Sequence, residues 1–360
     1  MAELSSASVG QLLRLSFAAG EELDAELVEV GDDALVALKI DDSFRYDGCL
    51  WAPRSALERA TVFDHADRLG RWLAGAHKPT SLGLAARADR SIDWAVDSEQ
   101  LVAVHDEQTH RFMVGWLRTR AGAVVLDEVL ADGRSRLGTG LRFAELQRLE
   151  WGSRYLEAVR LLHELADEAS VLTPYVEATR PAELTRLLQD ALQSGVLVHV
   201  VRAGEPGWYT GSVVGLGRSI VVLRELDEQS LEINGYMAFR RDCITKVALD
   251  QKHVARMRVL QARGQSIAAP RVWPSSIPAL LLALTRRDRE SAPLVAVQDH
   301  DPKASFVGHL IESSRSGDTT MHYVAPYGID DGTYSLPTNS IVTVEWGSRY
   351  LAAIEGMRRL

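Results

Sequence analysis

Two stretches of this chain carry the same heptapeptide, EWGSRYL, at Glu150–Leu156 and again at Glu345–Leu351. Such a duplication indicates internal repeats. Repeats restrict the fold strongly, because each copy must form the same local structure and pack in the same way. The segments around each heptapeptide should therefore carry other landmarks at a constant spacing.

Three such landmarks recur in three parts of the chain. Each part begins with a short apolar run typical of a β-strand, has a glycine 14 positions later, and ends with a strand of the form apolar-x-x-apolar. The first runs are Leu101–Val104, Leu197–Val200 and Leu294–Val297, the glycines are Gly115, Gly211 and Gly308, and the last strands are Leu146–Leu149, Ile244–Val247 and Ile341–Val344. Apolar residues three positions apart after each last strand predict a helix.

The first quarter of the chain carries a degenerate version of this pattern. It begins at Leu12, has Ala25 one position before the expected glycine, and closes with Leu57–Ala60, followed by a predicted helix. The chain is thus predicted to contain four repeats joined by helical linkers, most of them beginning near a proline. The predicted domains are residues 1–78, 79–166, 167–265 and 266–360, and each of the last three begins with a linker helix.

The third repeat carries the segment FRRDCI, Phe239–Ile244, before its last strand. Five short strands after a helix, with this segment, resemble the Sm-like family, in which an Arg-Gly-Asp or Arg-Gly-Asn turn joins the last two strands. Here Arg241 occupies the position of the turn glycine, and the family's Asp-x-apolar-Asn loop is not recognisable in any copy. The resemblance implies an α+β, mainly β fold of four tandem five-stranded Sm-like (SH3-like) barrels, each followed by a helix and joined by helical linkers.

The charge distribution bears on nucleic-acid binding. The net charge of -9 opposes contact with polyanions, but residues 181–270 contain 11 Lys and Arg against 9 Asp and Glu. Arg218, Arg240 and Arg241 fall on two loops that the resemblance places at one end of the third barrel. These three arginines are the predicted contacts for the phosphates of single-stranded RNA or DNA.

The repeated aromatic residues are interpreted as structural anchors, together with Gly115, Gly211 and Gly308. Trp151, Tyr155, Trp346 and Tyr350 stand where a last strand meets a helix. An aromatic plug between strand and helix is favoured over a stacking platform for bases, because buried aromatic residues dominate cores. For Arg154 and Arg349, a solvated side chain or pairing with a nearby acid on the helix surface is favoured over contact with a partner's carboxylate.

Composition and motifs give little support for catalysis. The histidines show no His-Glu-x-x-His pattern and no metal-ligand spacing with the two cysteines, and no nucleotide-binding or nucleophile-elbow motif is present. We therefore predict no enzymatic activity, catalytic residue, metal, cofactor or small-molecule substrate. Two cysteines and the lack of a long apolar run or a leader pattern predict a cytoplasmic protein that does not enter a membrane.

Two functional hypotheses follow, from different classes. The first is a cytoplasmic scaffold or assembly protein that binds protein partners, or further copies of itself, through the edge strands and loops of its barrels. The alternative is a single-stranded RNA- or DNA-binding protein that acts through the basic third barrel. Ligand sensing, as in WYL-type regulators, ranks third because the chain has no recognisable helix-turn-helix to act on.

Overall fold

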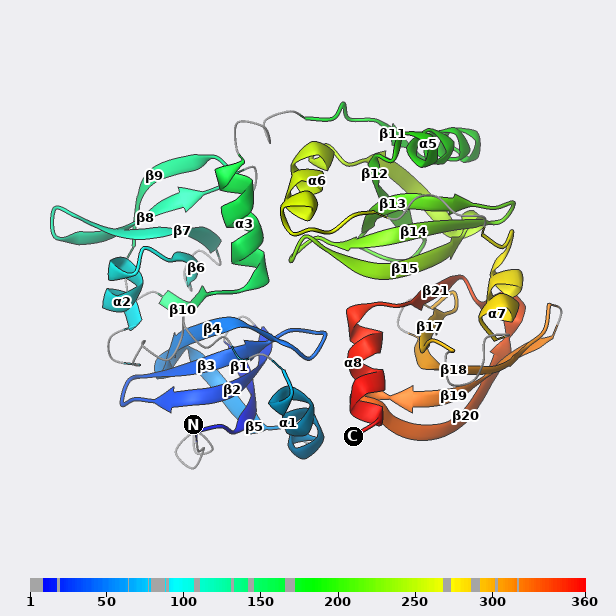
Figure 1. The fold of residues 1–360 in the computed structure, drawn as a ribbon. Helices are drawn as coiled ribbons and strands as arrows, with labels where there is room; N and C mark the ends of the chain where they lie inside the picture. The colour runs from blue at the N-terminus through cyan, green and yellow to red at the C-terminus, as the bar shows by residue number, and fades with distance from the viewer. Residues whose placement is uncertain are drawn as a thin grey trace. The chain divides into compact units, whose positions relative to one another are not determined.

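The computed structural model describes residues 9–17, 20–63, 65–76, 78, 88, 91–106, 111–130, 133–141, 146–165, 172–267, 273–285, 292–301, 304–315 and 317–360 (Figure 1). The chain divides into two compact units, Met1–Ser170 and Val171–Leu360. The predicted segments 1–78 and 79–166 fall in the N-terminal unit, and 167–265 and 266–360 fall almost entirely in the C-terminal unit. Much of the first predicted linker, and the ends of the third, lie outside the described residues.

The N-terminal unit contains one antiparallel sheet in the order β5-β1-β2-β3-β4-β10-β6-β7-β8-β9. Its strands are β1 (Leu12–Phe17), β2 (Glu22–Val30), β3 (Ala34–Ile40), β4 (Tyr46–Pro53), β5 (Leu57–Val62), β6 (Leu101–Asp106), β7 (Arg111–Arg120), β8 (Ala123–Val129), β9 (Ser135–Gly140) and β10 (Leu146–Trp151). The helices are α1 (Ala66–Ala74), α2 (Ser91–Asp97) and α3 (Arg154–Glu164). Strands β1–β5 form repeat 1 and β6–β10 form repeat 2.

The C-terminal unit contains a second antiparallel sheet in the order β11-β16-β12-β13-β14-β15-β21-β17-β18-β19-β20. Its strands are β11 (Glu177–Ala178), β12 (Leu197–Arg202), β13 (Tyr209–Leu216), β14 (Ile220–Asp227), β15 (Glu232–Arg240), β16 (Ile244–Leu249), β17 (Val295–Gln298), β18 (Ser305–Ser313), β19 (Asp318–Ala325), β20 (Ile329–Pro337) and β21 (Thr343–Trp346). The helices are α5 (Pro181–Ser194), α6 (His253–Ala262), α7 (Ile277–Thr285) and α8 (Arg349–Arg358). Strands β12–β16 form repeat 3 and β17–β21 form repeat 4.

The prediction of four separate barrels, each followed by its own helix, is wrong. The described strands form two large sheets that continue across a repeat boundary: β4 of repeat 1 pairs with β10 of repeat 2, and β15 of repeat 3 pairs with β21 of repeat 4. The physical reason lies in the unpaired backbone groups of the fourth strand, which find partners in the next repeat instead of within their own. Each sheet therefore joins two five-strand groups side by side.

The hydrophobic core of the C-terminal unit confirms this joining. One cluster combines Ile220 and Val222 of repeat 3 with Val295 and Val297 of repeat 4, and the buried face of α7 packs on it. A second cluster lies on the other side of repeat 3, where α5 covers β13 and β16. Repeats 3 and 4 share a core, so neither is a closed unit.

Helix α5 illustrates how local sequence fixes the elements around these cores. Pro181 occupies its first turn, and Gly195 ends it in the left-handed conformation with φ 73°. Leu184, Leu187 and Leu188 lie on one face and are buried against the sheet. The predicted linker helix thus begins near a proline, as the sequence pattern indicates.

The recurring glycines have a steric explanation. Gly211 pairs with Val198 on one side and with Glu225 on the other, and a Cβ built on it would lie 2.5 Å from the carbonyl oxygen of Arg224. At Gly115 and Gly308 a Cβ would overlap the carbonyl oxygens of Asp127 and His322 in the same way. Close approach of the neighbouring strand therefore requires glycine at this position.

Candidate functional site

The duplicated heptapeptide lies at the two places where one repeat joins the next. Its first residues belong to the last strand of repeats 2 and 4: Glu150 pairs with Leu50, and Glu345 pairs with Met237. We refer to the β4–β10 and β15–β21 contacts as the inter-repeat seams. Repeats 1 and 3 precede a seam and lack the heptapeptide, whereas repeats 2 and 4 follow one and carry it.

The glycine and serine of the heptapeptide turn the chain from the seam strand into a helix. Gly152 and Gly347 have φ of 69° and 68°, a conformation that favours glycine. The hydroxyl of Ser153 then accepts a hydrogen bond from the Leu156 backbone N–H at 3.2 Å, which caps α3, and Ser348 caps α8 through Leu351 at 3.3 Å. Each seam strand is therefore joined to a helix start by a two-residue turn.

The preceding repeat provides a matching surface for this turn. Gly235 has φ 84°, and a Cβ on it would lie 2.5 Å from the backbone N of Ser348. Gly48 has φ 86°, and a Cβ on it would lie equally close to the backbone of Gly152 and Ser153. The backbone of one repeat thus rests directly on a glycine of the other.

Arginine and a side-chain acceptor complete each seam. The backbone N–H of Arg154 donates to Asp47 at 2.8 Å, and its guanidinium donates to Asp41 at 2.9 Å. Arg349 repeats this pattern, donating from its backbone to Asn234 at 3.2 Å and from its side chain to Asp227. The expectation that these arginines are solvated or pair with an acid on the helix surface is wrong, because both bind acids of the preceding repeat.

The repeated aromatic residues lie inside the seams. Trp151 is fully buried with its ring 5.2 Å from that of Trp94, and Trp346 stacks on Tyr236 at 5.4 Å. Tyr155 and Tyr350 are half-buried at the start of α3 and α8, and burial raises the pKa of both phenols. The two tryptophans are therefore packed between repeats and present no face to a nucleic-acid base.

The two seams differ in charge at one equivalent position. Lys39 of β3 lies opposite Ala25, the residue of β2 at the glycine landmark. Glu225 of β14 lies opposite Gly211, the landmark glycine of β13, so Lys39 and Glu225 occupy equivalent positions. In the N-terminal unit Lys39 forms an ion pair of 2.8 Å with Glu150. In the C-terminal unit the equivalent residue, Glu225, is instead close enough to Glu345 for the two carboxyl groups to repel each other.

These surroundings shift the pKa values of the seam acids in opposite directions. Burial would raise the pKa of Glu150, but His105 at 3.2 Å and the charges of Lys39 and Arg148 hold that pKa well below its usual range. Burial, followed by repulsion from Glu345, raises the pKa of Glu225 to about 8. Burial also raises the pKa of Glu345.

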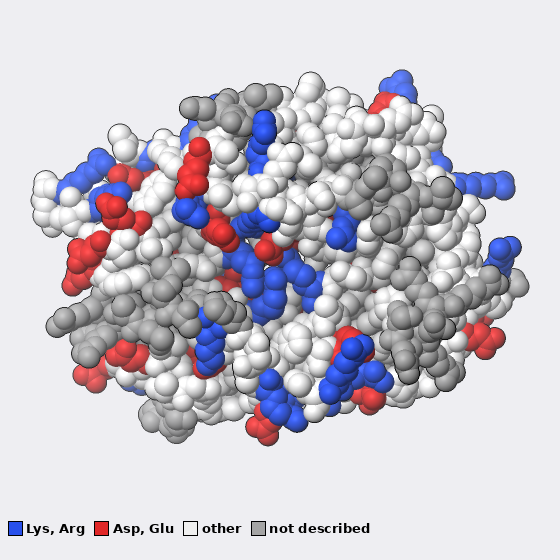
Figure 2. Space-filling view, viewed as in Figure 1, with Lys and Arg blue, Asp and Glu red and all other residues white. Residues whose placement is uncertain are grey.

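The structure brings the three predicted phosphate contacts to one end of repeat 3 but gives two of them protein partners. Arg240 donates to both carboxylate oxygens of Asp242 at 2.8 Å and to the Asn339 backbone, and Arg241 donates to the Arg218 carbonyl at 3.3 Å. Arg218 is exposed. The face seen in Figure 2 carries acidic as well as basic side chains. Arg240 and Arg241 thus serve contacts within the C-terminal unit.

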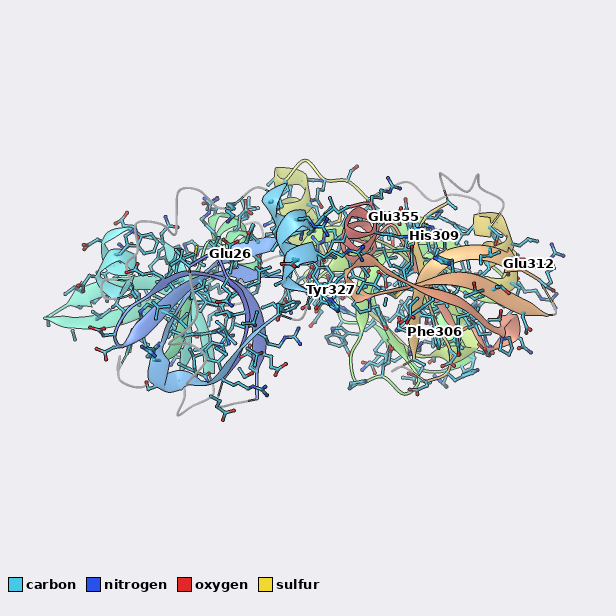
Figure 3. All side chains as sticks on the ribbon, turned by 90° about the horizontal axis from the view of Figure 1, so that it is seen from below. Glu26, Phe306, His309, Glu312, Tyr327 and Glu355 are labelled. Carbon is cyan, nitrogen blue, oxygen red and sulfur yellow. The ribbon has the colours of Figure 1, made fainter. Side chains whose placement is uncertain are left out.

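A cavity of about 650 Å³ lies between β18, β19 and α8, and sequence reasoning missed it. His309 Nε2 lies 3.0 Å from the Glu355 carboxylate, and Figure 3 shows the two side chains next to each other. His322 lies 3.3 Å from Asp330. Arg358 pairs with the same Asp330 at 2.8 Å. The charged groups of this cavity therefore pair with one another. No group of three or more His, Cys, Asp or Glu in the described ranges could hold a metal ion.

Repeat 3 holds a buried polar network that also escaped the sequence. His199 lies 2.7 Å from the Thr210 hydroxyl and 3.4 Å from Asp250, which Arg256 also approaches at 3.4 Å. Burial favours a raised pKa for Asp250, but the contacts with His199 and Arg256 outweigh it and lower the pKa. His199, Thr210 and Asp250 are all buried. The network links β12, β13 and α6.

Two fourth strands have no covering neighbour among the described residues, because β9 and β20 are the last strands of their sheets. Six consecutive residues of β20, at 330–335, are exposed. Gly332 in β20 has φ 79° and Gly138 in β9 has φ 77°, and no heavy atom of the described residues lies within 4 Å of a Cβ built on either. Gly138 and Gly332 at the two sheet edges thus correspond to Gly48 and Gly235 at the seams, but no described residue covers them.

Comparison with known proteins adds no family. No protein-family model matches the chain, and no curated protein matches it significantly. Among solved structures the chain aligns with the sliding clamp, subunit beta of DNA polymerase III, from Bartonella birtlesii. That alignment has 9% identity, covers 97% of this chain and 82% of the clamp, and has a TM-score of 0.10. A similarity at that TM-score carries no argument about fold or function. None of the helices in the described ranges is long and apolar enough to cross a membrane.

Proposed function

We propose that this protein is a non-enzymatic binding protein that takes an extended segment of a protein partner at the outer edge of β20. The observation that carries the proposal is the exposed edge itself. A nine-residue strand with six exposed residues in a row ends the C-terminal sheet, and its backbone groups can form a ladder with another strand. An edge strand with unpaired backbone groups is the place where an extended segment of another chain can add to a sheet.

The other features of the chain support a binding role over catalysis. The charged groups of the cavity beside α8 pair with one another, and the polar network of repeat 3 is buried. The nucleic-acid alternative loses support because Arg240 and Arg241 are held by protein partners. The cytoplasm remains the expected compartment, and it fits the two buried free cysteines.

Lysine at two exposed positions of β20 tests this function. We expect the double variant Thr333→Lys, Ser335→Lys to lose most of its retained partner, because edge lysines oppose strand pairing. The measurement is quantitative affinity purification of the full-length protein from nuclease-treated native extract, with light scattering to detect self-association. The matched control is Ser135→Lys, Leu137→Lys on β9, which should keep the partner. Equal retention by wild type and the β20 variant would contradict the proposal, as would a strict monomer that retains no protein.

A further inference from the structure

We infer that the segment bound at β20 is a strand that ends in a glycine turn and a serine-capped helix start, the chemistry of Glu345–Leu351, supplied by a partner polypeptide. This inference rests on the proposed function and names the partner's recognition segment. It depends on a structural equivalence between β20 and the two strands that already hold such a segment, β4 and β15.

The equivalence is visible in a bulge that each fourth strand carries at the same place. In β4, Asp47 and Gly48 fall where the pairing with β3 shifts by one residue, between Cys49 and Tyr46. Asn234 and Gly235 hold this position in β15, and Asp331 and Gly332 hold it in β20. The glycines have φ of 86°, 84° and 79°. The three strands therefore present the same backbone shape.

The difference between these strands is what lies above the glycine. At Gly48 and Gly235 the backbone of Gly152–Ser153 or Gly347–Ser348 covers the position where a Cβ would be. At Gly332 no heavy atom in the described part of the chain lies within 4 Å of that position. The surface that accepts a glycine–serine turn is thus formed at β20 and open. We refer to Asp331, Gly332 and Thr333 as the β20 socket.

Asp331 supplies the second element of recognition. Asp47 and Asn234, at the same position of their bulges, accept the first helical N–H of α3 and α8 at 2.8 and 3.2 Å. A carboxylate favours this contact further, because the N-terminus of a helix carries partial positive charge. Asp331 is exposed and offers the same acceptor to an incoming helix start.

The edge of the N-terminal sheet lacks this acceptor. In β9 the residue before the bulge glycine, Gly138, is Leu137, which is 72% exposed and cannot accept a hydrogen bond through its side chain. The socket chemistry is therefore specific to β20, and β9 provides a natural comparison within one chain.

The socket also differs from the seams in one respect that limits the partner. Asp227 is the last residue of β14 and binds Arg349 of the heptapeptide, but Ala325 holds the matching place at the end of β19. Recognition at β20 therefore depends on the strand, the glycine turn and the helix start, without the acid that Asp227 supplies to the arginine. The partner residue equivalent to Trp346 would pair with Thr333, as Trp346 pairs with Tyr236.

A labelled synthetic peptide of residues 341–351 provides the probe. We expect full-length wild-type protein to bind it with one site per chain in fluorescence anisotropy. Loss of the helix-start acceptor in Asp331→Leu should weaken binding about 10-fold, the effect of one hydrogen bond to a charged group. Gly332→Val should abolish binding, because its Cβ would occupy the place of the turn. Leu137→Asp should add a second site at β9. Peptides with Gly347→Val or Ser348→Ala should bind less well than the parent.

Hydrogen–deuterium exchange locates the bound peptide. Protection on binding is expected within residues 329–337, whereas a loss of protection within 341–348 would mean that the peptide displaces β21 from the seam. No binding to wild-type protein, or binding that Asp331→Leu and Gly332→Val leave unchanged, would overturn the inference. If the lysine variant of β20 loses its native partner while wild type ignores the peptide, the proposed function stands and the inference fails. If neither effect is seen, both fail.

Discussion

Valine in place of Gly235 is expected to lower the free energy of unfolding of the C-terminal unit by about 4 kcal/mol, whereas valine in place of Gly332 should cost only about 2 kcal/mol. Both glycines have positive φ, 84° and 79°, so a β-branched residue is strained at either position. Only at Gly235 does the new Cβ also meet the Ser348 backbone N, at 2.5 Å. The seam must then open, because neither backbone can give way.

Hydrogen–deuterium exchange of the full-length protein resolves the two effects. Gly235→Val should remove protection from residues 232–240 and 341–348 together, because both strands of the seam lose their partner. Gly332→Val should leave these segments protected and serves as the matched control for backbone strain. Similar losses in the two variants would show that strain at positive φ, and not the covering turn, is responsible.

The two units are expected to respond to pH with opposite signs at the same structural position. The folded pKa of Glu150 is depressed, so its stabilisation is present above the unfolded value of 4.5 and is lost as pH falls below it. The folded pKa of Glu225 is raised to about 8, so its stabilisation is present below 4.5 and is lost as pH rises through about 8. Acid should therefore weaken the β4–β10 seam, and rising pH should weaken the β15–β21 seam.

Glu225→Gln isolates the second effect. It removes the titration, so the C-terminal seam should become more stable than wild type by about 2 kcal/mol at pH 8 and change little at pH 5, after allowance for partial solvent screening. Glu225→Lys should stabilise the seam at both pH values, because it recreates with Glu345 the pair formed by Lys39 and Glu150 at 2.8 Å. The measurement is exchange protection of residues 232–240, compared with wild type at each pH. A wild-type advantage at pH 8 would contradict the assignment.

Local patterns in the chain were sufficient to locate many of the strands and helices. The apolar runs at Leu101 and Leu197 begin β6 and β12, and the glycines at a constant interval mark the second strand of three repeats. These features were readable because they depend on neighbours close in sequence or on the absence of a side chain. The heptapeptide was likewise recognised as important, but its role as a joint between repeats was not.

That role depends on contacts across long stretches of chain. Glu150 pairs with Leu50, and Arg154 binds Asp41, more than a hundred positions away. Sequence periodicity contains no information about which edge strands pair with each other. Four closed barrels and two continuous sheets are therefore equally compatible with it. The β20 socket was hidden for the same reason, since Asp331 and Gly332 resemble an ordinary turn until they are compared with Asn234 and Gly235.

The amino-acid order therefore specified a mainly β chain with a repeated strand order, because alternation, glycine spacing and helix caps act over a few residues. The joining of repeats in pairs, the burial of Trp151 and Trp346, and the opposite charge of the two seams arose from pairing between distant strands. Backbone groups at a strand edge must find partners, and folding satisfied them across repeat boundaries at β4 and β15 while leaving β20 open.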